Sequence, residues 1–288
     1  MQTITALISQ ATLLLADAGV DSPRLDAELL LAHVLGKERR WLWSYPEAQP
    51  SAAEQQAFFG LLARRRQREP LAYLLGEWEF YGRKFFVTPA VLIPRPETEL
   101  LVEAVLAWAA ERQAASVVDV GVGSGAIAVT LALEAPHLRM LATDLSREAL
   151  AVARRNAERY GVAARIEWAC GDLLSPLLAS ACDPVDIVVA NLPYIAEEDL
   201  AGLMPEVGQY EPLLALCAGG AGLALIARLI AQAPRMLAGD GLLALEIGYN
   251  QAAQVKMLLA GAHWRHIRCL TDYAGIPRHL LAITPCIV

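Results

Sequence analysis

The sequence predicts an α/β fold: a doubly wound, Rossmann-like domain preceded by a small helical-bundle domain. From about residue 91 onward, short apolar runs alternate with segments of helical periodicity, as expected for a mainly parallel sheet covered by helices. Before that point, helix caps and helical periodicity dominate. A chain of 288 residues is long enough for two domains. We therefore expect a helical domain at residues 1–75, a β-hairpin linker at 76–90 and an α/β domain at 91–288.

The amino-terminal helices have clear boundary signals. Asp21-Ser22-Pro23 begins one helix, and Gly36 ends it. Ser51 and Glu54 have the spacing of a capping box, which opens a second helix. This second helix ends in the basic run at residues 64–68. We expect its arginines to complement the helix carboxyl terminus in solvent, and contact with a protein partner or RNA is the alternative.

The α/β part is expected to begin with a hairpin, because residues 78–87 are rich in aromatic and β-branched side chains around a Tyr-Gly turn. Ser146 caps a helix at residues 149–160, and Gly161 closes it. The expected strands of the sheet are residues 116–120, 138–143, 165–169, 185–190, 241–247, 263–270 and 279–284.

A glycine-rich turn follows the first of these strands. Gly121, Gly123 and Gly125 would let the backbone turn sharply and let a ligand approach it closely. Gly121, Gly123 and Ala126 also fit the dinucleotide-binding pattern G-x-G-x-x-G/A. Asp119, just before the turn, favours S-adenosylmethionine instead. A carboxylate there would repel a pyrophosphate and attract the cationic amino-acid end of this methyl donor.

Two further acidic residues follow the next two strands. Asp144 comes directly after strand 138–143, where a carboxylate could accept both ribose hydroxyls. Asp172 follows strand 165–169, where it could meet the adenine amino group. Each aspartate alone could equally belong to a turn or a helix cap. The three together favour a donor site at the edge of the sheet.

Strand 185–190 runs into the tetrapeptide Asn191-Leu192-Pro193-Tyr194. Asn191 offers a side-chain carbonyl to one N–H, and the backbone carbonyl of Leu192 can accept a second. The Tyr194 ring can lie against the flat face of an amide or a base. These properties suit methyl transfer to a planar nitrogen. The simpler alternative is that Asn and Pro only mark a strand-to-helix loop.

The glycine turn, Asp144 and the tetrapeptide together resemble the class I methyltransferases that modify amino nitrogens. Residues 76–82 and 91–102 resemble, more specifically, the protein-(glutamine-N5) methyltransferases that act on class I peptide chain release factors. Residues 210–212 and 246–251 match the same family. The resemblance covers essentially the whole chain.

The resemblance implies transfer of a methyl group from S-adenosyl-L-methionine, with S-adenosyl-L-homocysteine as product, to the glutamine side-chain amide in the Gly-Gly-Gln motif of release factors. This modification supports translation termination, and the helical domain would recognise the protein substrate. The residues that would bind the donor are Asp119, Gly121, Val122, Gly123, Ser124, Gly125, Asp144, Asp172, Leu173 and Asn191. Those that would hold the substrate glutamine are Asn191, Leu192, Pro193 and Tyr194. Arg95, Glu97 and Thr98 would support the donor pocket.

One departure from the family pattern concerns the tetrapeptide, which usually reads Asn-Pro-Pro-Tyr. With Leu192 in the second position the carbonyl contact is retained, although leucine frees φ and adds an N–H. Asn-Leu-Pro-Tyr is typical of ribosomal RNA adenine dimethylases, which are not expected to carry residues 94–99 or such a helical domain. The sequence also leaves open a glutamine methyltransferase acting on a ribosomal protein, an adenine-N6 methyltransferase acting on RNA or DNA, and a non-catalytic binding module.

Composition narrows the partners and the compartment. The formal net charge of −7 argues against broad nucleic-acid binding. The cysteines are Cys170, Cys182, Cys217, Cys269 and Cys286. They lack C-x-x-C spacing, so we expect free thiols in a reducing cytosol. The histidines lack metal-ligand spacing, and no segment has the length or flanks of a membrane span or signal peptide. We expect a cytoplasmic monomer without a metal.

Overall fold

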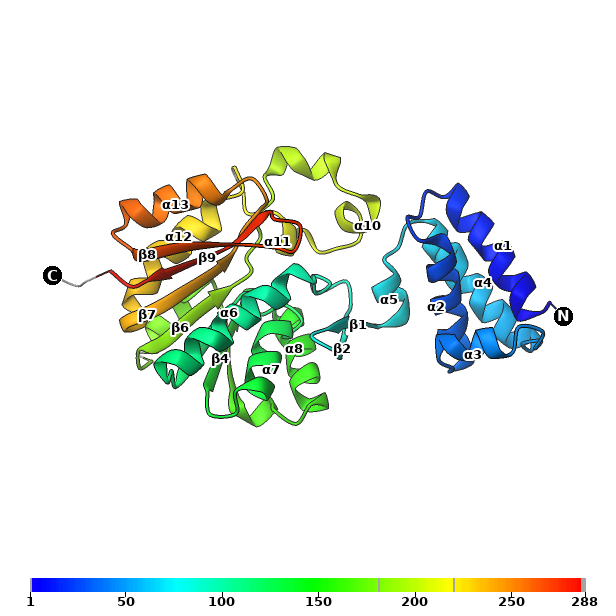
Figure 1. Cartoon of the computed structure of the whole chain (residues 1–288), viewed down its shortest axis with the longest axis horizontal. Coiled ribbons are helices and arrows are strands. Elements are labelled where there is room, and N and C mark those ends of the chain that lie inside the picture. The colour runs from blue at the N-terminus through cyan, green and yellow to red at the C-terminus, as the bar shows by residue number, and fades with distance from the viewer. Residues whose placement is uncertain (1, 181, 220, 286–288) are drawn as a thin grey trace. The chain divides into compact units, whose positions relative to one another are not determined.

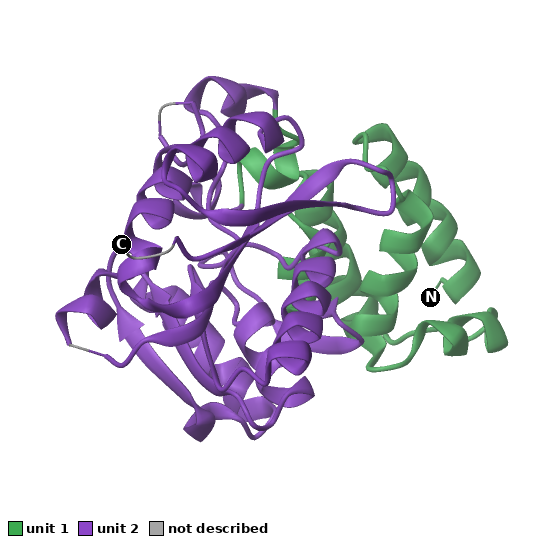
Figure 2. Cartoon of the chain, turned by 60° about the vertical axis from the view of Figure 1, so that its left-hand side comes forward, with its two compact units in different colours: residues 1–77, 203–210 green, residues 78–202, 211–288 purple. Residues whose placement is uncertain are grey.

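The computed structural model describes residues 2–180, 182–219 and 221–285, which form two compact units (Figure 2). The first unit, green in Figure 2, contains the chain up to Glu77 together with the segment Leu203–Tyr210. The second unit, purple in Figure 2, contains Trp78–Gly202 and the residues from Glu211 onward.

The first unit is helical, and its boundaries follow local capping rules. The predicted helix end at Gly36 is confirmed, because this residue has the left-handed conformation with φ 61°. The predicted capping box is also confirmed: Ser51 and Glu54 exchange side-chain to backbone hydrogen bonds. The helices of this unit are α1 (Ile4–Asp17), α2 (Pro23–Leu35), α3 (Arg39–Ser44), α4 (Ala52–Arg66), α5 (Leu71–Leu75) and α10 (Pro205–Gly208).

The basic run at the end of α4 does not simply face solvent. Arg65 is buried, and its Nε donates to Asp26 at 2.7 Å, while its Nη1 donates to Glu206 at 2.9 Å. Arg68 binds the same Glu206 carboxylate through two nitrogens, at 2.6 and 2.7 Å. The prediction of solvent-facing arginines is therefore wrong for Arg65 and Arg68, because acidic side chains far away in the sequence bind them.

These ion pairs also place the segment Leu203–Tyr210 in the helical unit. The Tyr210 hydroxyl adds a hydrogen bond to the Gln67 carbonyl at 2.7 Å. The sequence assigned this segment to the α/β domain because it lies between residues 91 and 288. The structure differs there, since carboxylate and hydroxyl groups of the segment meet partners on the helical unit.

A hairpin of β1 (Glu77–Phe80) and β2 (Arg83–Phe86) follows. Tyr81 and Gly82 form its turn with φ of 52° and 66°, as a two-residue hairpin turn with positive φ at both positions requires. Phe80 and Phe85 are almost wholly buried, and their rings meet edge to face with centroids 5.9 Å apart. The hairpin thus contributes aromatic side chains to the core of the second unit.

The second unit contains, among the described residues, a seven-stranded sheet in the order β5-β4-β3-β6-β7-β9-β8. The five strands from β5 to β7 are parallel, and β9 is antiparallel to both of its neighbours. The strands are β3 (Ser116–Val120), β4 (Arg139–Asp144), β5 (Ile166–Cys170), β6 (Val185–Ala190), β7 (Leu237–Glu246), β8 (Arg265–Thr271) and β9 (Pro277–Ile283). The Rossmann-like α/β class predicted from the sequence is confirmed, although β7 begins four residues earlier than the predicted 241.

Helices cover both faces of this sheet (Figure 1). Apolar side chains of α6 (Glu97–Arg112), α7 (Ala126–Glu134) and α8 (Arg147–Arg159) share one buried core, and those of α12 (Ala224–Gln232) and α13 (Ala252–Gly261) share another. Ser146 accepts a hydrogen bond from the Ala149 N–H at 3.1 Å, which confirms it as the cap of α8. The remaining short helices are η1 (Ala163–Arg165), α9 (Ser175–Ala179), η2 (Glu197–Gly202), α11 (Leu213–Leu216) and η3 (Ala233–Arg235).

The cysteines within the described residues, Cys170, Cys182, Cys217 and Cys269, are free thiols. Cys286 lies outside the described residues. Across the described ranges, no helix combines the length and the apolar character that crossing a membrane requires.

Replacing Arg65 by alanine should destabilise the protein strongly. The change would leave the buried Asp26 carboxylate without its guanidinium partner, and removal of one partner from a buried ion pair costs about 3 to 5 kcal/mol. Urea unfolding followed by circular dichroism measures this loss. Arg66→Ala is the matched control: its side chain is exposed, and it should change the free energy of unfolding by less than about 0.5 kcal/mol. Equal effects of the two substitutions would contradict a structural role for the buried pair.

Candidate active site

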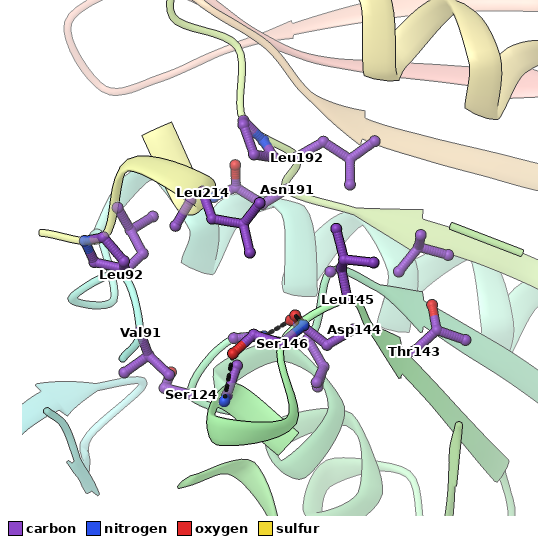
Figure 3. A pocket seen from close by; sticks show the side chains of 18 of the residues that line it. Val91, Leu92, Ser124, Thr143, Asp144, Leu145, Ser146, Asn191, Leu192 and Leu214 are labelled. Atoms are coloured by element: carbon purple, nitrogen blue, oxygen red, sulfur yellow. Dashed lines mark hydrogen bonds between the residues drawn. The ribbon is translucent and has the colours of Figure 1, made fainter. Parts of the chain in front are cut away.

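A cavity opens at the carboxyl edge of the parallel strands of the second unit (Figure 3). The segments that follow β3, β4, β5 and β6 all contribute to its walls. Its volume of about 320 Å³ lies within the roughly 300 to 1,000 Å³ typical of small-molecule sites. The carboxyl edge, at the point where the strand order reverses between β3 and β6, is where open α/β sheets bind ligands.

Most residues singled out from the sequence meet in this cavity. Those that line it are Arg95, Thr98, Gly121, Val122, Gly123, Ser124, Asp144, Asp172, Leu173, Asn191, Leu192 and Pro193. Four others, Glu97, Asp119, Gly125 and Tyr194, contribute no surface to it. In Figure 3, Asn191 and Leu214 lie on one side of the cavity, and Asp144 and Ser146 lie on the other.

The glycine turn after β3 brings the backbone close to the cavity and to the β6 loop. Gly121 has φ 78°, and a Cβ added there would lie 3.1 Å from Cδ2 of Leu192. Gly125 instead begins α7, with φ 83°, and a Cβ there would lie 3.2 Å from Ala153 on α8. Gly121 therefore serves the close approach of two loops, and Gly125 serves helix packing.

Asp144 links the turn after β3 to the turn after β4 in the wall of the cavity. One carboxylate oxygen accepts the Gly123 N–H at 2.9 Å, and the other accepts the Ser146 N–H at 2.8 Å. Burial raises the pKa of this carboxyl, and the backbone N–H groups oppose the rise. The Leu145 N–H also hydrogen-bonds this carboxylate, and the remaining lone-pair capacity is available to a ligand in the cavity.

Asp119 lies wholly buried behind the glycine turn. Its Oδ2 accepts the Ala128 N–H at 3.0 Å, whereas its Oδ1 has no partner among the described residues. Burial raises the pKa of Asp119 to about 7, against the smaller opposing effect of the Ala128 N–H. The predicted direct contact of Asp119 with the amino-acid end of the donor does not fit this position.

Asp172, on the wall after β5, is half exposed and forms an ion pair with Arg228 of α12. Sequence reasoning could not find this partner, because 56 residues separate the pair. The guanidinium occupies one oxygen of the carboxylate that was expected to meet an adenine amino group. Asp172 lines the cavity, so its other carboxylate oxygen is the one that could accept a hydrogen bond from a ligand.

Asn191, at the end of β6, is part of a chain of side-chain hydrogen bonds. Its Nδ2 donates to Oγ1 of Thr98 at 3.1 Å, and the Thr98 hydroxyl donates to Oε2 of Glu246 at 2.7 Å. Thr98 lies in the first turn of α6, and Glu246 ends β7. The side chain predicted to bind substrate is thus held by residues from two other elements of the same unit.

Tyr194, three residues further along the same segment, is partly buried. Burial raises the pKa of its hydroxyl to about 12, so the phenol stays protonated at neutral pH. Its backbone carbonyl accepts a hydrogen bond from Nε2 of Gln251 at 2.8 Å, and Oε1 of Gln251 accepts the Gly248 N–H at 2.9 Å. Gln251 therefore fixes the end of the β6 loop against the loop that follows β7.

Arg95 supports the cavity through an ion pair with the buried carboxylate of Glu211. The second oxygen of Glu211 accepts the Ile93 N–H at 3.2 Å. Burial raises the pKa of Glu211, and Arg95 opposes that rise. The ion pair of Arg95 with Glu211 joins two segments that are distant in sequence and that both match the same family. Both segments reach the cavity, because Pro94 and Pro212 line it.

Sequence reasoning missed part of the wall. The turn after Asp144 contributes residues that could have been found as immediate neighbours of a strand-end aspartate. The hairpin and α11 also contribute residues to the wall, and no local sequence pattern indicates that these elements reach the cavity. The missed residues include Phe80, Leu92, Leu145, Ser146, Glu148, Leu214 and Ala215. Throughout the described ranges, no cluster of His, Cys, Asp and Glu side chains could hold a metal ion.

Comparisons with known proteins agree with this geometry. Residues 117–210 match the family described as a methyltransferase domain, and residues 6–76 match the PrmC N-terminal domain. Among solved structures, the hMettl16 catalytic domain aligns with a TM-score of 0.55 at 18% identity, covering 77% of this chain and 81% of that chain. A methyltransferase from Pyrococcus furiosus aligns with a TM-score of 0.50 at 16% identity, covering 72% and 91%. Both likenesses concern the fold alone. Fold and site together define an S-adenosylmethionine-dependent methyltransferase.

Similar sequences identify the family. The release factor glutamine methyltransferase of Bordetella pertussis is 46% identical and covers 92% of this chain and 96% of its own length. Those of Nitratidesulfovibrio vulgaris and Chlorobaculum tepidum are each 42% identical, covering 97% and 96% of this chain and 95% and 96% of their own lengths. This chain belongs to the release factor glutamine methyltransferase family, a family of protein-modifying enzymes.

The buried Asp119 should make stability depend on pH in a defined window. Between its ordinary pKa of 3.8 and about 7, the unfolded carboxyl is ionised while the folded one keeps its proton. The folded state then binds more protons at this group, so the contribution of Asp119 to the free energy of unfolding falls by about 1.4 kcal/mol per pH unit as pH rises, and the fall ends above about 7.

Asp119→Asn removes this titration. The free energy of unfolding of the variant minus that of the wild type should therefore rise by several kcal/mol from about pH 4 to about pH 7 and stay level above. Urea unfolding of both proteins across this range measures the difference. A difference that does not change with pH would contradict the raised pKa.

Proposed function

We propose that this chain transfers a methyl group from S-adenosylmethionine to the side-chain amide nitrogen, N5, of the glutamine in the Gly-Gly-Gln motif of class I peptide chain release factors. The observation that carries the proposal is the orientation of Asn191, whose amide nitrogen is engaged by Thr98, so that its carbonyl oxygen is left for an N–H of the substrate. The names of the closely similar relatives support a release factor as the protein that supplies this amide. The proposed setting is the cytoplasm, with the enzyme acting as a monomer and the helical unit, residues 1–75 in the sequence-based division, recognising the release factor.

The cavity has the properties that the methyl donor requires. Positive φ angles at Gly121 and Gly123 let a ligand lie against the turn without a Cβ in the way. Asp144 is the proposed acceptor for the ribose hydroxyls, and Asp172 is the proposed acceptor for the adenine amino group. When bound, S-adenosylmethionine supplies a methyl group on a positively charged sulfur. The donor residues assigned from sequence remain the proposed ones, except that Asp119 and Gly125 contribute no surface to the cavity and would support the glycine turn instead of contacting the donor.

The substrate amide would be held by two acceptors. Oδ1 of Asn191 accepts one N–H, and the backbone carbonyl of Leu192 accepts the other. An amide nitrogen is a poor nucleophile, because its lone pair is delocalised into the carbonyl. Two carbonyl dipoles pointing at its hydrogens favour the positive charge that develops on this nitrogen as the new N–C bond forms. Holding the nitrogen in line with the methyl group contributes further, since good alignment is worth up to about 7 to 11 kcal/mol.

Tyr194 and Pro193 would complete the substrate site by fixing the plane of the amide. The Tyr194 hydroxyl is no candidate for a base, because it holds its proton far above neutral pH. Neither acceptor takes the proton either, since both are neutral carbonyl groups. The extra proton leaves to solvent once the nitrogen carries the methyl group.

Mass spectrometry of a purified class I release factor, after incubation with this protein and S-adenosylmethionine, tests the proposal. The peptide that bears Gly-Gly-Gln should gain one methyl group on its glutamine. Retained donor binding with no change to that peptide would refute the proposed substrate and direct the assay to ribosomal proteins and then to RNA.

Asn191→Ala should lower turnover by about a hundredfold to a thousandfold, the loss seen when one preorganised hydrogen-bonding group is removed from a site of developing charge. Binding of the donor, measured by calorimetry, should be largely retained and should fall far less than turnover, because Asp144 and the glycine turn are unchanged. Tyr194→Phe is the control: it keeps the ring and should retain turnover within a few-fold. Near wild-type turnover of Asn191→Ala would remove this residue from the mechanism.

A further inference from the structure

A chain of three hydrogen-bonded side chains runs from the candidate active site into the core. Asn191 donates to Thr98 at 3.1 Å, and Thr98 donates to Glu246 at 2.7 Å. Thr98 and Glu246 are only 4% and 3% exposed. The Thr98–Glu246 bond spans 148 residues of sequence and joins the first turn of α6 to the end of β7.

The direction of this chain follows from its chemistry. A carboxylate has no proton, so Glu246 can only accept a hydrogen bond. The single hydroxyl proton of Thr98 therefore goes to Glu246, and toward Asn191 the Thr98 oxygen can only accept. Asn191 must consequently turn its NH₂ group toward Thr98, which fixes the side of the amide that holds Oδ1. The hydrogen-bond network thus decides an amide orientation that electron density often leaves open.

The surroundings of Glu246 preserve this direction. Within the described part of the chain, the basic group found within 4 Å of the carboxylate is His279, at 3.8 Å, and neither ring nitrogen of His279 has a hydrogen-bond partner. Glu246 pairs with His279 in the register of β7 and β9. No arginine or lysine from the described ranges forms an ion pair with Glu246. No such cation therefore competes with the Thr98 hydroxyl for this carboxylate.

We propose that Thr98 and Glu246 are positioning residues that lock Asn191 with its carbonyl oxygen toward the substrate, and that this lock makes the site select an amide over a carboxylate. The proposal rests on the proposed function, because it assigns the substrate group that Asn191 meets. A glutamine amide donates two N–H groups to the carbonyl oxygens of Asn191 and Leu192. A glutamate carboxylate has no hydrogen to donate, so it would face two acceptors and be repelled.

Breaking the lock should change selectivity as well as rate. In Thr98→Val the Asn191 amide loses its acceptor and can turn, which presents NH₂ to the cavity for part of the time. In that orientation the NH₂ group can donate a hydrogen bond to a carboxylate but cannot accept one from an N–H. The variant should therefore lose turnover on glutamine and bind the glutamate form of the substrate relatively better.

The experiment uses the full chain and a release factor with either Gln or Glu at the methylated position. We expect Thr98→Val to lower kcat roughly tenfold to a hundredfold, in line with the loss of a buried hydrogen bond in a preorganised site. The ratio of the affinities for the Gln and Glu forms should fall several-fold, while the dissociation constant of S-adenosylmethionine stays within about twofold. Thr98→Ser keeps the hydroxyl and should restore both kcat and the ratio.

Thr130→Val is the matched control. Thr130 is a fully buried threonine of α7 in the same unit, it does not line the cavity, and its hydroxyl has no partner among the described residues. The same change of shape and polarity should therefore leave kcat and the affinity ratio unchanged.

Glu246→Gln provides a second variant. The new carboxamide can accept from or donate to Thr98, so the direction of the chain is no longer imposed. Its affinity ratio for the Gln and Glu forms should lie between those of the wild type and Thr98→Val. A melting temperature close to wild type for each variant separates positioning from loss of fold.

Two results would overturn the proposal. One is a Thr98→Val enzyme with wild-type kcat and an unchanged affinity ratio. The other is an equal loss in Thr98→Ser and Thr98→Val, which would show that the hydroxyl is not responsible. Failure of the wild-type enzyme to methylate the glutamine would instead refute the proposed function, so the two failures are distinguishable.

Discussion

The parallel arrangement of β3, β4, β5 and β6 is the constraint on which the site depends. Parallel strands deliver all their carboxyl ends to one edge, so four loops that are distant in sequence meet there. Asp144 then ties two of these loops by accepting the Gly123 and Ser146 N–H groups. Strand direction therefore brings many of the groups of the site together, and the connection between β6 and β7 adds Pro212, Leu214 and Ala215.

A second layer of contacts fixes these loops from outside the sheet. Glu211 binds Arg95, Gln251 binds the Tyr194 carbonyl, and Thr98 binds Asn191. Each contact joins a strand-end loop to a segment that precedes or follows the sheet core in sequence. The segments that resemble the family most specifically are therefore those that hold the site in shape, whereas the glycine turn resembles many nucleotide-binding proteins.

The sequence predicted what local rules determine. Helix caps at Ser51 and Gly36, the hairpin turn and the apolar strands all depend on neighbouring residues, and the structure confirms them. Most proposed donor residues followed from their places at strand ends. The burial of Asp119, its absence from the cavity wall and the ion pair of Asp172 with Arg228 were not predictable, because each depends on packing between elements. Glu206 was missed for the same reason.

The capture of Leu203–Tyr210 by the helical unit has a consequence for dissecting the protein. A truncation that starts after Glu77 would keep this segment but remove Arg65, Arg68 and Gln67, the residues that bind it. Glu206 would lose both of its guanidinium partners. The contacts divide the chain into two units, but no single cut in the chain separates them. An isolated catalytic fragment would therefore need a redesigned 203–210 segment.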